Sequence, residues 1–260
     1  MRYDQISPVP PLTKVTKNVI ILCVVIYFFD LITDSLGIRF GFYRLNELFG
    51  LVPAFVLEKG WVWQFVTYIF MHGHMLHLLM NMLILWYFGA EIEMRLGELN
   101  FLKYFLLCGV GAGLFNFGVN LLVAHMTGTR VLANPIVGAS GAIFGILAAY
   151  GIFYGNRYFL VFFLFPMKAK YFVLLMAGIE LVMGIEANPR DNVAHFAHIG
   201  GMAVGALYIY LKYVKGPLFG GSQSKKDAER DNLRRQFRLI VNQDDNEDNK
   251  QDGGGPSYWN

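Results

Sequence analysis

The stretch GASGAIFGILAAYGIFY, residues 138–154, decides how the rest of this chain is interpreted. It is a mainly apolar segment of small, branched and aromatic residues, and its one serine, Ser140, lies near its start. The neighbouring serines along the chain are Ser35 and Ser222, so Ser140 stands alone over a long apolar region. A polar group in such a segment is costly unless it has a partner or a task. The surrounding sequence must therefore show what Ser140 would meet.

The composition is that of a membrane protein. Hydrophobic residues make up 55% of the 260 residues, charged residues make up 16%, and the mean hydropathy is +0.41. A soluble domain is not this apolar, so much of the apolar surface is expected to face lipid. Cys23 and Cys108 both lie within apolar runs and do not indicate a disulfide framework. The fold class predicted is an all-α polytopic membrane protein.

Six segments are predicted to be membrane-spanning helices, because a span needs about 20 mainly apolar residues. They cover residues 18–32, 75–90, 101–123, 138–154, 171–185 and 193–210. The apolar run 157–170 is short and broken by Pro166, so we interpret it as an interfacial or protein-packed segment. The predicted organisation is a polar cytoplasmic segment (1–17), a six-span membrane domain (18–214) and a polar, disordered cytoplasmic tail (215–260). No removable signal peptide is expected.

Basic residues predict the orientation of these spans. With six spans and both termini on one side, that side carries 17 of the 22 lysines and arginines. Both termini are therefore predicted to be cytoplasmic, in an integral multi-pass protein of a bacterial plasma membrane. The first connection, residues 37–72, is rich in aromatic residues and is expected to lie partly in the outer interface. The lipid bilayer is an expected partner, and nothing in the sequence indicates nucleic acid.

Polar residues gather at the same ends of three predicted spans. His77 precedes Asn81 by four positions, which places both on one helical face. The second, fourth and sixth spans run in the same direction, so His77, Ser140 and His198 lie near their outer ends. A serine hydrolase needs a hydroxyl nucleophile, a base that takes its proton and donors around the developing oxyanion. These residues therefore predict a hydrolytic site in one shallow layer.

Small residues at helical spacing would allow two of these spans to pack closely. They are Gly141 and Gly145 on the fourth span, and Gly201 and Gly205 on the sixth. Close packing would bring the serine to the histidine of the sixth span. The N-terminus of the fourth helix would also direct free N–H groups toward the same layer.

Three other kinds of protein are considered. Histidines at helix ends bind metals, and the candidates are His72, His74, His77, His195 and His198. No carboxylate or thiolate is spaced to join them, so a site without a metal is favoured. A transporter is disfavoured because acidic residues within the predicted spans are few, and Asp30 and Glu180 are the only clear candidates. A soluble α/β-hydrolase is excluded, because Ala142 stands where its G-x-S-x-G elbow needs glycine.

Taken together, the motifs resemble those of the rhomboid family of intramembrane serine proteases. The resemblance covers about residues 62–210 and rests on HLLMN (77–81), GASGAIFG (138–145) and AHIGGMAVG (197–205), in the order of the family. It implies a six-transmembrane-helix bundle with a water-filled cavity open to the outside. It also implies a Ser–His dyad without an aspartate, no metal or organic cofactor, and hydrolysis of transmembrane segments of membrane-protein substrates near the outer face.

The resemblance also implies roles for individual residues. Ser140 would be the nucleophile and His198 the general base. The oxyanion would lie among His77, Asn81 and the backbone N–H of Ser140. His195 would have a supporting or interfacial role.

Other positions match the family or depart from it. Glu93 and Arg95 match positions that the family uses to brace the cytoplasmic side. Gln64 follows Trp63 where many bacterial members have an arginine with a structural role. Phe144 stands where a tyrosine often stacks on the catalytic imidazole, and a phenyl ring is expected to stack there too.

The alternative function is a catalytically silent rhomboid-like protein that binds transmembrane helices for quality control or trafficking. Such a protein would be recognised by the loss of the serine or the histidine. Both Ser140 and His198 are present, so the protease is the favoured interpretation.

Overall fold

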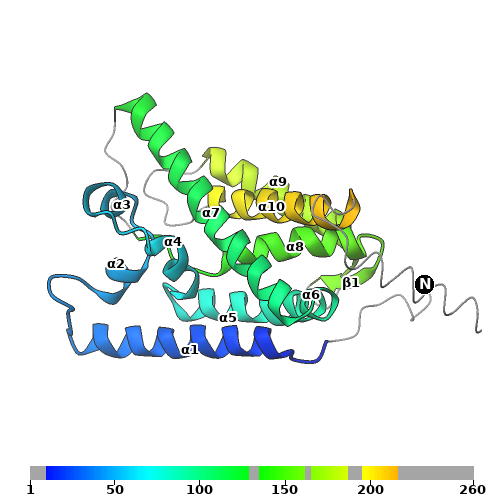
Figure 1. Ribbon diagram of the computed structural model, residues 1–260, viewed down its shortest axis with the longest axis horizontal. Coiled ribbons are helices and arrows are strands. Elements are labelled where there is room, and N and C mark those ends of the chain that lie inside the picture. The colour runs from blue at the N-terminus through cyan, green and yellow to red at the C-terminus, as the bar shows by residue number, and fades with distance from the viewer. Residues whose placement is uncertain (1–9, 129–134, 162–164, 187–194, 216–260) are drawn as a thin grey trace, which may run out of the picture. The chain divides into compact units, whose positions relative to one another are not determined.

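The computed structural model describes residues 10–128, 135–161, 165–186 and 195–215. The chain divides into two units, residues 1–210 and 211–260, and each is considered by itself. Of the second unit only residues 211–215 are described, and residues 211–214 belong to the π-helix η4 (Tyr210–Val214). Most residues of the predicted tail lie outside the described part of the chain, so the structure does not test the disorder predicted for them. The described residues of the first unit form helices and one small antiparallel sheet (Figure 1).

Within the described residues, three helical stretches are long and apolar enough to cross a membrane. They are α1 (Lys14–Ser35), the stretch Met75–Leu96 and α7 (Glu98–Thr127). The stretch Met75–Leu96 comprises α5 (Met75–Ile84), a π-helical turn η3 (Leu85–Gly89) and α6 (Ala90–Leu96). Large apolar side chains on their outer faces, such as Leu76 and Leu79, are exposed. Such an exterior suits lipid better than water, so these helices place the chain in a membrane.

Three shorter helices complete the set of predicted spans. They are α8 (Ser140–Tyr154), α9 (Ala169–Glu186) and α10 (His195–Ile209). Each of the six predicted spans thus corresponds to a helix. Length and composition identify only the three longer stretches as membrane-spanning, so the six-span arrangement remains a prediction.

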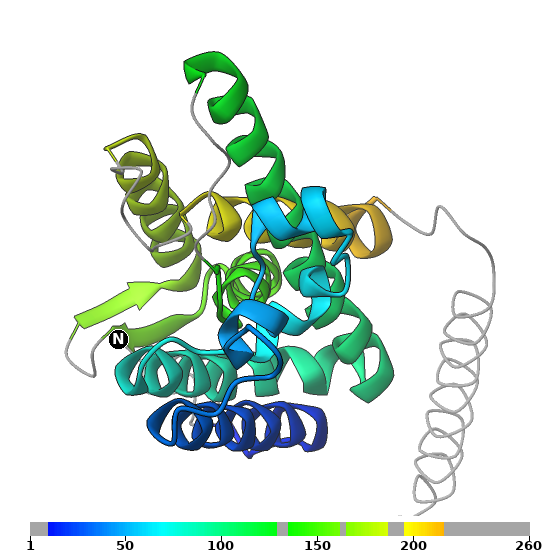
Figure 2. The ribbon, with the colours of Figure 1, turned by 90° about the vertical axis from the view of Figure 1, so that its left-hand side faces the viewer.

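Helix α8 lies in the middle of the first unit, where Figure 2 shows it end-on with α5, α7, α9 and α10 around it. Its buried residues are Gly141 to Ile143 and Gly145 to Tyr150. The second run is longer than one helical turn, so buried residues lie on every side of the helix. A helix that is apolar on all sides is one that other helices surround. The sequence of α8 therefore accounts for its central position.

Glycines allow α8 and α10 to touch through their backbones. A Cβ atom at Gly201 would overlap the carbonyl oxygen of Gly141, and one at Gly205 would lie 2.8 Å from the Cα of Gly145. Any larger side chain would push the two helices apart. Tyr104 of α7 joins the same contact, since its hydroxyl donates a hydrogen bond of 2.6 Å to the carbonyl oxygen of Gly145.

The connection between the second and third long helices is shorter than predicted. The gap expected at residues 91–100 is helical except at Gly97, because α6 continues to Leu96 and α7 begins at Glu98. Gly97 has φ of 80°, a backbone conformation that glycine adopts without steric cost. A single glycine is therefore enough to reverse the chain here.

Between α8 and α9 the chain forms an antiparallel hairpin of β1 (Tyr158–Val161) and β2 (Phe165–Lys168). Tyr158 pairs with Lys168 across the two strands. The interpretation that this segment does not span the membrane agrees with the hairpin, but its strands were not predicted. Pro166 is accommodated because both strands of a two-stranded sheet are edge strands.

The first connection folds into short helices: α2 (Leu45–Phe49), α3 (Pro53–Lys59), α4 (Gln64–Thr67) and the 3₁₀ turn η2 (Tyr68–Phe70). Gln64 is fully buried and holds these turns together. Its amide oxygen accepts a 2.9 Å hydrogen bond from the backbone N–H of Val52, and its amide nitrogen donates one of 2.8 Å to the carbonyl oxygen of Glu47. Gln64 thus has a structural role of the kind that the resemblance assigns to an arginine.

Glu93 on α6 caps the N-terminus of α1. Its carboxylate accepts hydrogen bonds from the backbone N–H groups of Val15 (2.9 Å) and Thr16 (2.8 Å), which have no partner within the helix. The guanidinium of Arg95 lies 4.1 Å from the centre of the Phe153 ring on α8. These contacts join α1, α6 and the C-terminal end of α8.

Candidate active site

Ser140 and His198 are in direct contact. The Oγ of Ser140 lies 2.7 Å from the Nε2 of His198. Ser140 is the first residue of α8 and His198 is in the first turn of α10, so the glycine contact between these helices places the two side chains together. A hydroxyl that donates to an imidazole nitrogen is the arrangement in which the imidazole can take the hydroxyl proton.

Phe144 fixes the plane of the His198 ring. The two rings are stacked, with centroids 4.4 Å apart and an angle of 10° between their planes. Phe144 lies one turn after Ser140 on α8, so the helix that carries the hydroxyl also carries the stacking ring. The stacking expected for a phenyl group at this position is confirmed.

A cavity of about 550 Å³ lies beside this pair. Ser140 and His198 line it together with His77, Gly138 and Tyr68. The cavity therefore gives a ligand direct access to the serine hydroxyl. Its size is within the range of ligand-binding pockets in proteins.

His77 packs against the backbone just before α8. A Cβ atom at Gly138 would lie 2.8 Å from both Cε1 and Nε2 of the His77 ring. Gly138 also has φ of 129°, which residues with a side chain rarely adopt. Glycine is thus required at position 138 both by the backbone conformation and by the close approach of His77. This close approach places the His77 ring on the cavity wall near Ser140.

Asn81 is placed differently from His77. It is buried on α5, and its Nδ2 donates a 2.9 Å hydrogen bond to the carbonyl oxygen of His77. It is not among the residues that line the cavity. Of the groups predicted around the oxyanion, His77 and Ser140 therefore line the cavity, whereas Asn81 donates one amide N–H to the backbone of α5.

The rings of the histidines at the start of α5 are neighbours, but among the described residues they do not form a group of converging ligand atoms. The ring centroid of His77 lies 5.2 Å from that of His72 and 5.6 Å from that of His74. His72 is almost fully buried, and burial, together with the neighbouring His77, lowers the pKa of His72 to about 4. His72 is therefore neutral at physiological pH. The Nδ1 of His74 accepts a hydrogen bond from the backbone N–H of His77, which caps α5.

A carboxylate approaches the other two histidines from α9. The Oε2 of Glu180 lies 2.7 Å from the Nδ1 of His195 and 2.9 Å from the Nδ1 of His198. Within the described part of the chain, these three side chains form a group whose possible ligand atoms lie within 4.8 Å of one another. The expectation that no carboxylate joins the histidines is therefore wrong. The signal in the sequence is Glu180 itself, an acidic residue within an apolar stretch of α9, but its position along the chain does not connect it to the histidines.

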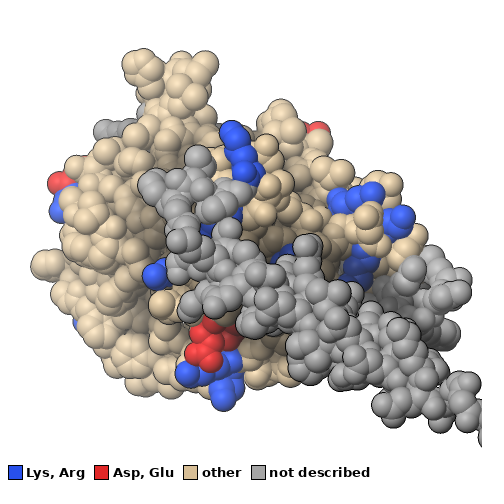
Figure 3. Space-filling view, turned by 45° about the vertical axis from the view of Figure 1, so that its right-hand side comes forward, with Lys and Arg blue, Asp and Glu red and all other residues tan. Residues whose placement is uncertain are grey.

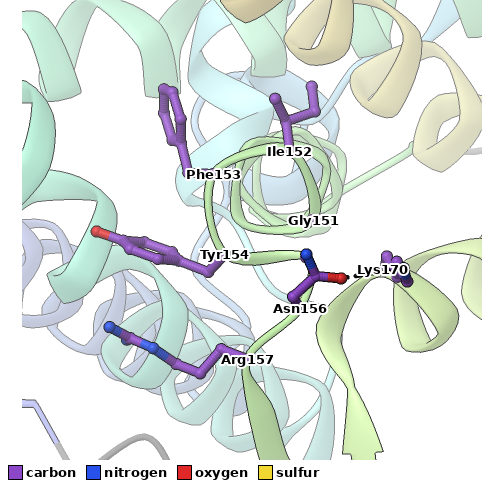
Figure 4. Close-up of a pocket in the computed structure, with 8 residues that line it drawn as sticks. Gly151, Ile152, Phe153, Tyr154, Asn156, Arg157 and Lys170 are labelled. Atoms are coloured by element: carbon purple, nitrogen blue, oxygen red, sulfur yellow. Dashed lines mark hydrogen bonds between the residues drawn. The ribbon is translucent and has the colours of Figure 1, made fainter. Parts of the chain in front are cut away.

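A second cavity, of about 500 Å³, lies at the opposite end of α8 (Figure 4). Its lining includes Tyr154, Asn156, Arg157 and Lys170. Lys170 donates a 3.0 Å hydrogen bond to the side-chain oxygen of Asn156, and Arg157 forms an ion pair with Glu91. The residues that line this cavity include neither a serine nor a histidine, so it offers no counterpart of the Ser140 site.

The fold and the site together define a class: a helical membrane protein with a serine–histidine pair beside a cavity. The family model of the Rhomboid domain matches residues 59–215. The chain belongs to the rhomboid family.

Curated relatives agree with this assignment. The chain is 28% identical over 186 residues to "Rhomboid protein 1, mitochondrial" of Saccharomyces cerevisiae, a match that covers 69% of this chain and 52% of that protein. It is 29% identical over 204 residues to RHOMBOID-like protein 4 of Arabidopsis thaliana, covering 74% of this chain and 47% of that protein. The chain thus spans about half the length of these relatives. Their mitochondrial and plant sources do not support the predicted bacterial plasma membrane.

Proposed function

We propose that this protein is an intramembrane serine endopeptidase that cleaves transmembrane segments of membrane-protein substrates. The observation that carries the proposal is the 2.7 Å contact between Ser140 Oγ and His198 Nε2 at the wall of a cavity of about 550 Å³. Membership of the rhomboid family supports an intramembrane protease or a rhomboid-like protein. The presence of both residues, in contact, favours the protease.

In the proposed reaction, Nε2 of His198 takes the proton of Ser140 while Oγ attacks a backbone carbonyl carbon of the substrate. The protonated imidazole then gives this proton to the nitrogen of the leaving amine. A water molecule, deprotonated by the same Nε2, attacks the acyl-enzyme and releases the second product. The reaction uses Ser140 and His198 alone for proton transfer and bond formation.

The oxyanion of the tetrahedral intermediate would be stabilised at the N-terminus of α8. Backbone N–H groups in the first turn of a helix have no partner within that helix, and the helix dipole favours negative charge there. We assign the backbone N–H of Ser140 and the ring of His77 to this task, with Asn81 in support through the backbone of α5. His77 lines the same cavity as Ser140, which supports its direct role.

The proposed membrane arrangement has six spans with both termini in the cytoplasm. Figure 3 shows the side that carries α6 and β1 in Figure 1, where blue patches of Lys and Arg are more extensive than red patches of Asp and Glu. Arg95 and Arg157 both contact the ring of Tyr154, at the end of α8 away from Ser140. Basic residues favour the cytoplasmic side, so this arrangement would put Ser140 near the outer face.

The proposal is tested by labelling with a fluorophosphonate, which reacts with an activated serine. The full chain, in detergent or proteoliposomes, is expected to be labelled, and peptide mapping is expected to place the label on Ser140. Ser140→Ala should remove the label, and His198→Ala should reduce its rate of formation at least about 10²-fold because the base is lost. His125→Ala, at an exposed histidine of α7, is the control and should label as wild type.

Two results would contradict the protease. One is a label that persists in Ser140→Ala. The other is a folded wild-type protein that is not labelled and cleaves no transmembrane substrate, which would favour a catalytically silent protein that binds transmembrane helices.

A further inference from the structure

Glu180 is an acidic residue in an otherwise apolar stretch of α9, and its side chain faces α10. About 12% of its side-chain surface is exposed, and the side chains of His195 and His198 are buried to a similar degree. A carboxylate in such surroundings is costly unless it is paired. Its two nearest charged or polar partners are the Nδ1 atoms of these histidines, so the carboxylate is held where the proposed base is.

The protons of this cluster follow from its donors and acceptors. An ionised carboxylate only accepts hydrogen bonds, so the Nδ1 of His195, at 2.7 Å, must carry the proton of that bond. The Nε2 of His198 must be free of a proton to accept from Ser140, which places the ring proton on Nδ1. This Nδ1 lies 2.9 Å from Oε2 of Glu180, at an angle that falls outside hydrogen-bond geometry. The contact therefore acts on His198 chiefly through charge.

We propose that Glu180 is a positioning residue for His198. Its carboxylate favours the tautomer with the proton on Nδ1, which leaves Nε2 free to take the proton of Ser140. It also stabilises the imidazolium that forms as Ser140 attacks. His195 anchors the carboxylate through its own hydrogen bond. This inference rests on the proposed function, and it adds a third member to the dyad that the resemblance implies.

The interatomic distances in this cluster fit one hydrogen bond and one charge contact better than a metal ion. Ligand atoms about 2.0–2.1 Å from a tetrahedral zinc ion lie about 3.3 Å from each other. The distances from Oε2 to the two Nδ1 atoms, 2.7 and 2.9 Å, are shorter and typical of hydrogen-bonded or ion-paired atoms. A zinc site is thus disfavoured, and the kinetic test includes a chelator to detect one.

The kinetic test compares Glu180→Gln with Glu186→Gln, which removes the same charge from the exposed end of the same helix. The full chain is reconstituted with a transmembrane substrate. Glu180→Gln is expected to lower kcat on the order of 10²-fold and to change KM less than about threefold, because the carboxylate acts on the base and not on substrate binding. Glu186→Gln should match wild type. A wild-type kcat in Glu180→Gln would overturn the proposal, as would inhibition by EDTA that zinc reverses.

A second measurement does not depend on proteolysis. Nitrogen NMR of protein with labelled histidine distinguishes imidazole tautomers, and His198→Ala identifies the signal of His198. Wild type is expected to hold the proton on Nδ1, and Glu180→Gln is expected to show a mixture of tautomers, because the neutral amide lacks the negative charge that favours a proton on Nδ1. The same tautomers in both proteins would overturn the role of Glu180. If wild type cleaves nothing but shows the difference, the proposed function fails and the effect of Glu180 on His198 stands.

Discussion

At the scale of single residues, the ring of His198 is held by side chains from two other helices. Ser140 meets its Nε2, Phe144 covers one face of the ring, and Glu180 lies beside its Nδ1. A ring constrained in this way points Nε2 at the serine before any substrate arrives. Such preorganisation lowers the cost of reaching the transition state, because the reacting groups need not be oriented during the reaction.

Removal of His77, which is assigned to the oxyanion, and removal of Asn81, which is assigned a supporting role, should have different effects on turnover. His77→Ala is expected to lower kcat by about 10² to 10³ with little change in KM, because a donor to the oxyanion strengthens its bond only as charge develops. Asn81→Ala should cost less, because its amide bonds to the backbone of α5 and does not line the cavity. Steady-state cleavage of a reconstituted substrate measures both values. Equal kcat losses would give Asn81 a direct role, and a loss confined to KM would remove His77 from the oxyanion.

The contact between Ser140 and His198 could be anticipated from the sequence, because both belong to motifs that resemble those of a known family. The contact of Glu180 with the histidines could not. It depends on how α9 is rotated against α10, and α9 is apolar on most of its surface, so periodicity does not reveal which face meets its neighbour. The hydrogen bond of Asn81 to His77 follows from their spacing of four residues, but its competition with an oxyanion role appears only in the structure.

At the scale of elements, the contact between α8 and α10 sets the distance between nucleophile and base. Gly201→Leu is expected to separate the helices and to lower kcat/KM at least about 10²-fold, since small displacements of reacting groups are costly. Gly118→Leu is the matched control, because Gly118 of α7 is exposed and a Cβ atom there would meet nothing within 4 Å. Fluorophosphonate labelling and substrate cleavage report the effect. Full activity of Gly201→Leu would show that close packing is not needed.

The positions of the long helices were predictable, because each corresponds to an apolar run in the sequence. Their ends were less so. The polar residues 91–100 suggested a loop, but Glu93 is used to cap α1 and only Gly97 interrupts the helices. The hairpin at Tyr158–Lys168 escaped prediction because its apolar residues run on without the alternation that marks a strand.

At the scale of the first unit as a whole, α8 separates two kinds of contact. Its N-terminal end carries Ser140 beside the cavity that is proposed to receive substrate. Near its C-terminal end, the ion pair of Glu91 with Arg157 and the packing of Arg95 on Phe153 tie the helix to its neighbours. The N-terminal end of α8 is thus accessible from the cavity, and the C-terminal end is held by contacts with neighbouring elements.

Ser140, activated by His198, is proposed to cleave peptide bonds within transmembrane segments. The most direct measurement is cleavage of a single-span substrate in proteoliposomes, with the cut site identified by mass spectrometry. We expect wild type to cut within the outer part of the apolar segment, and Ser140→Ala to leave the substrate intact while remaining folded. Chelators should have no effect. Cleavage by Ser140→Ala at the wild-type rate, or a wild-type activity that phenanthroline abolishes and zinc restores, would contradict the serine mechanism.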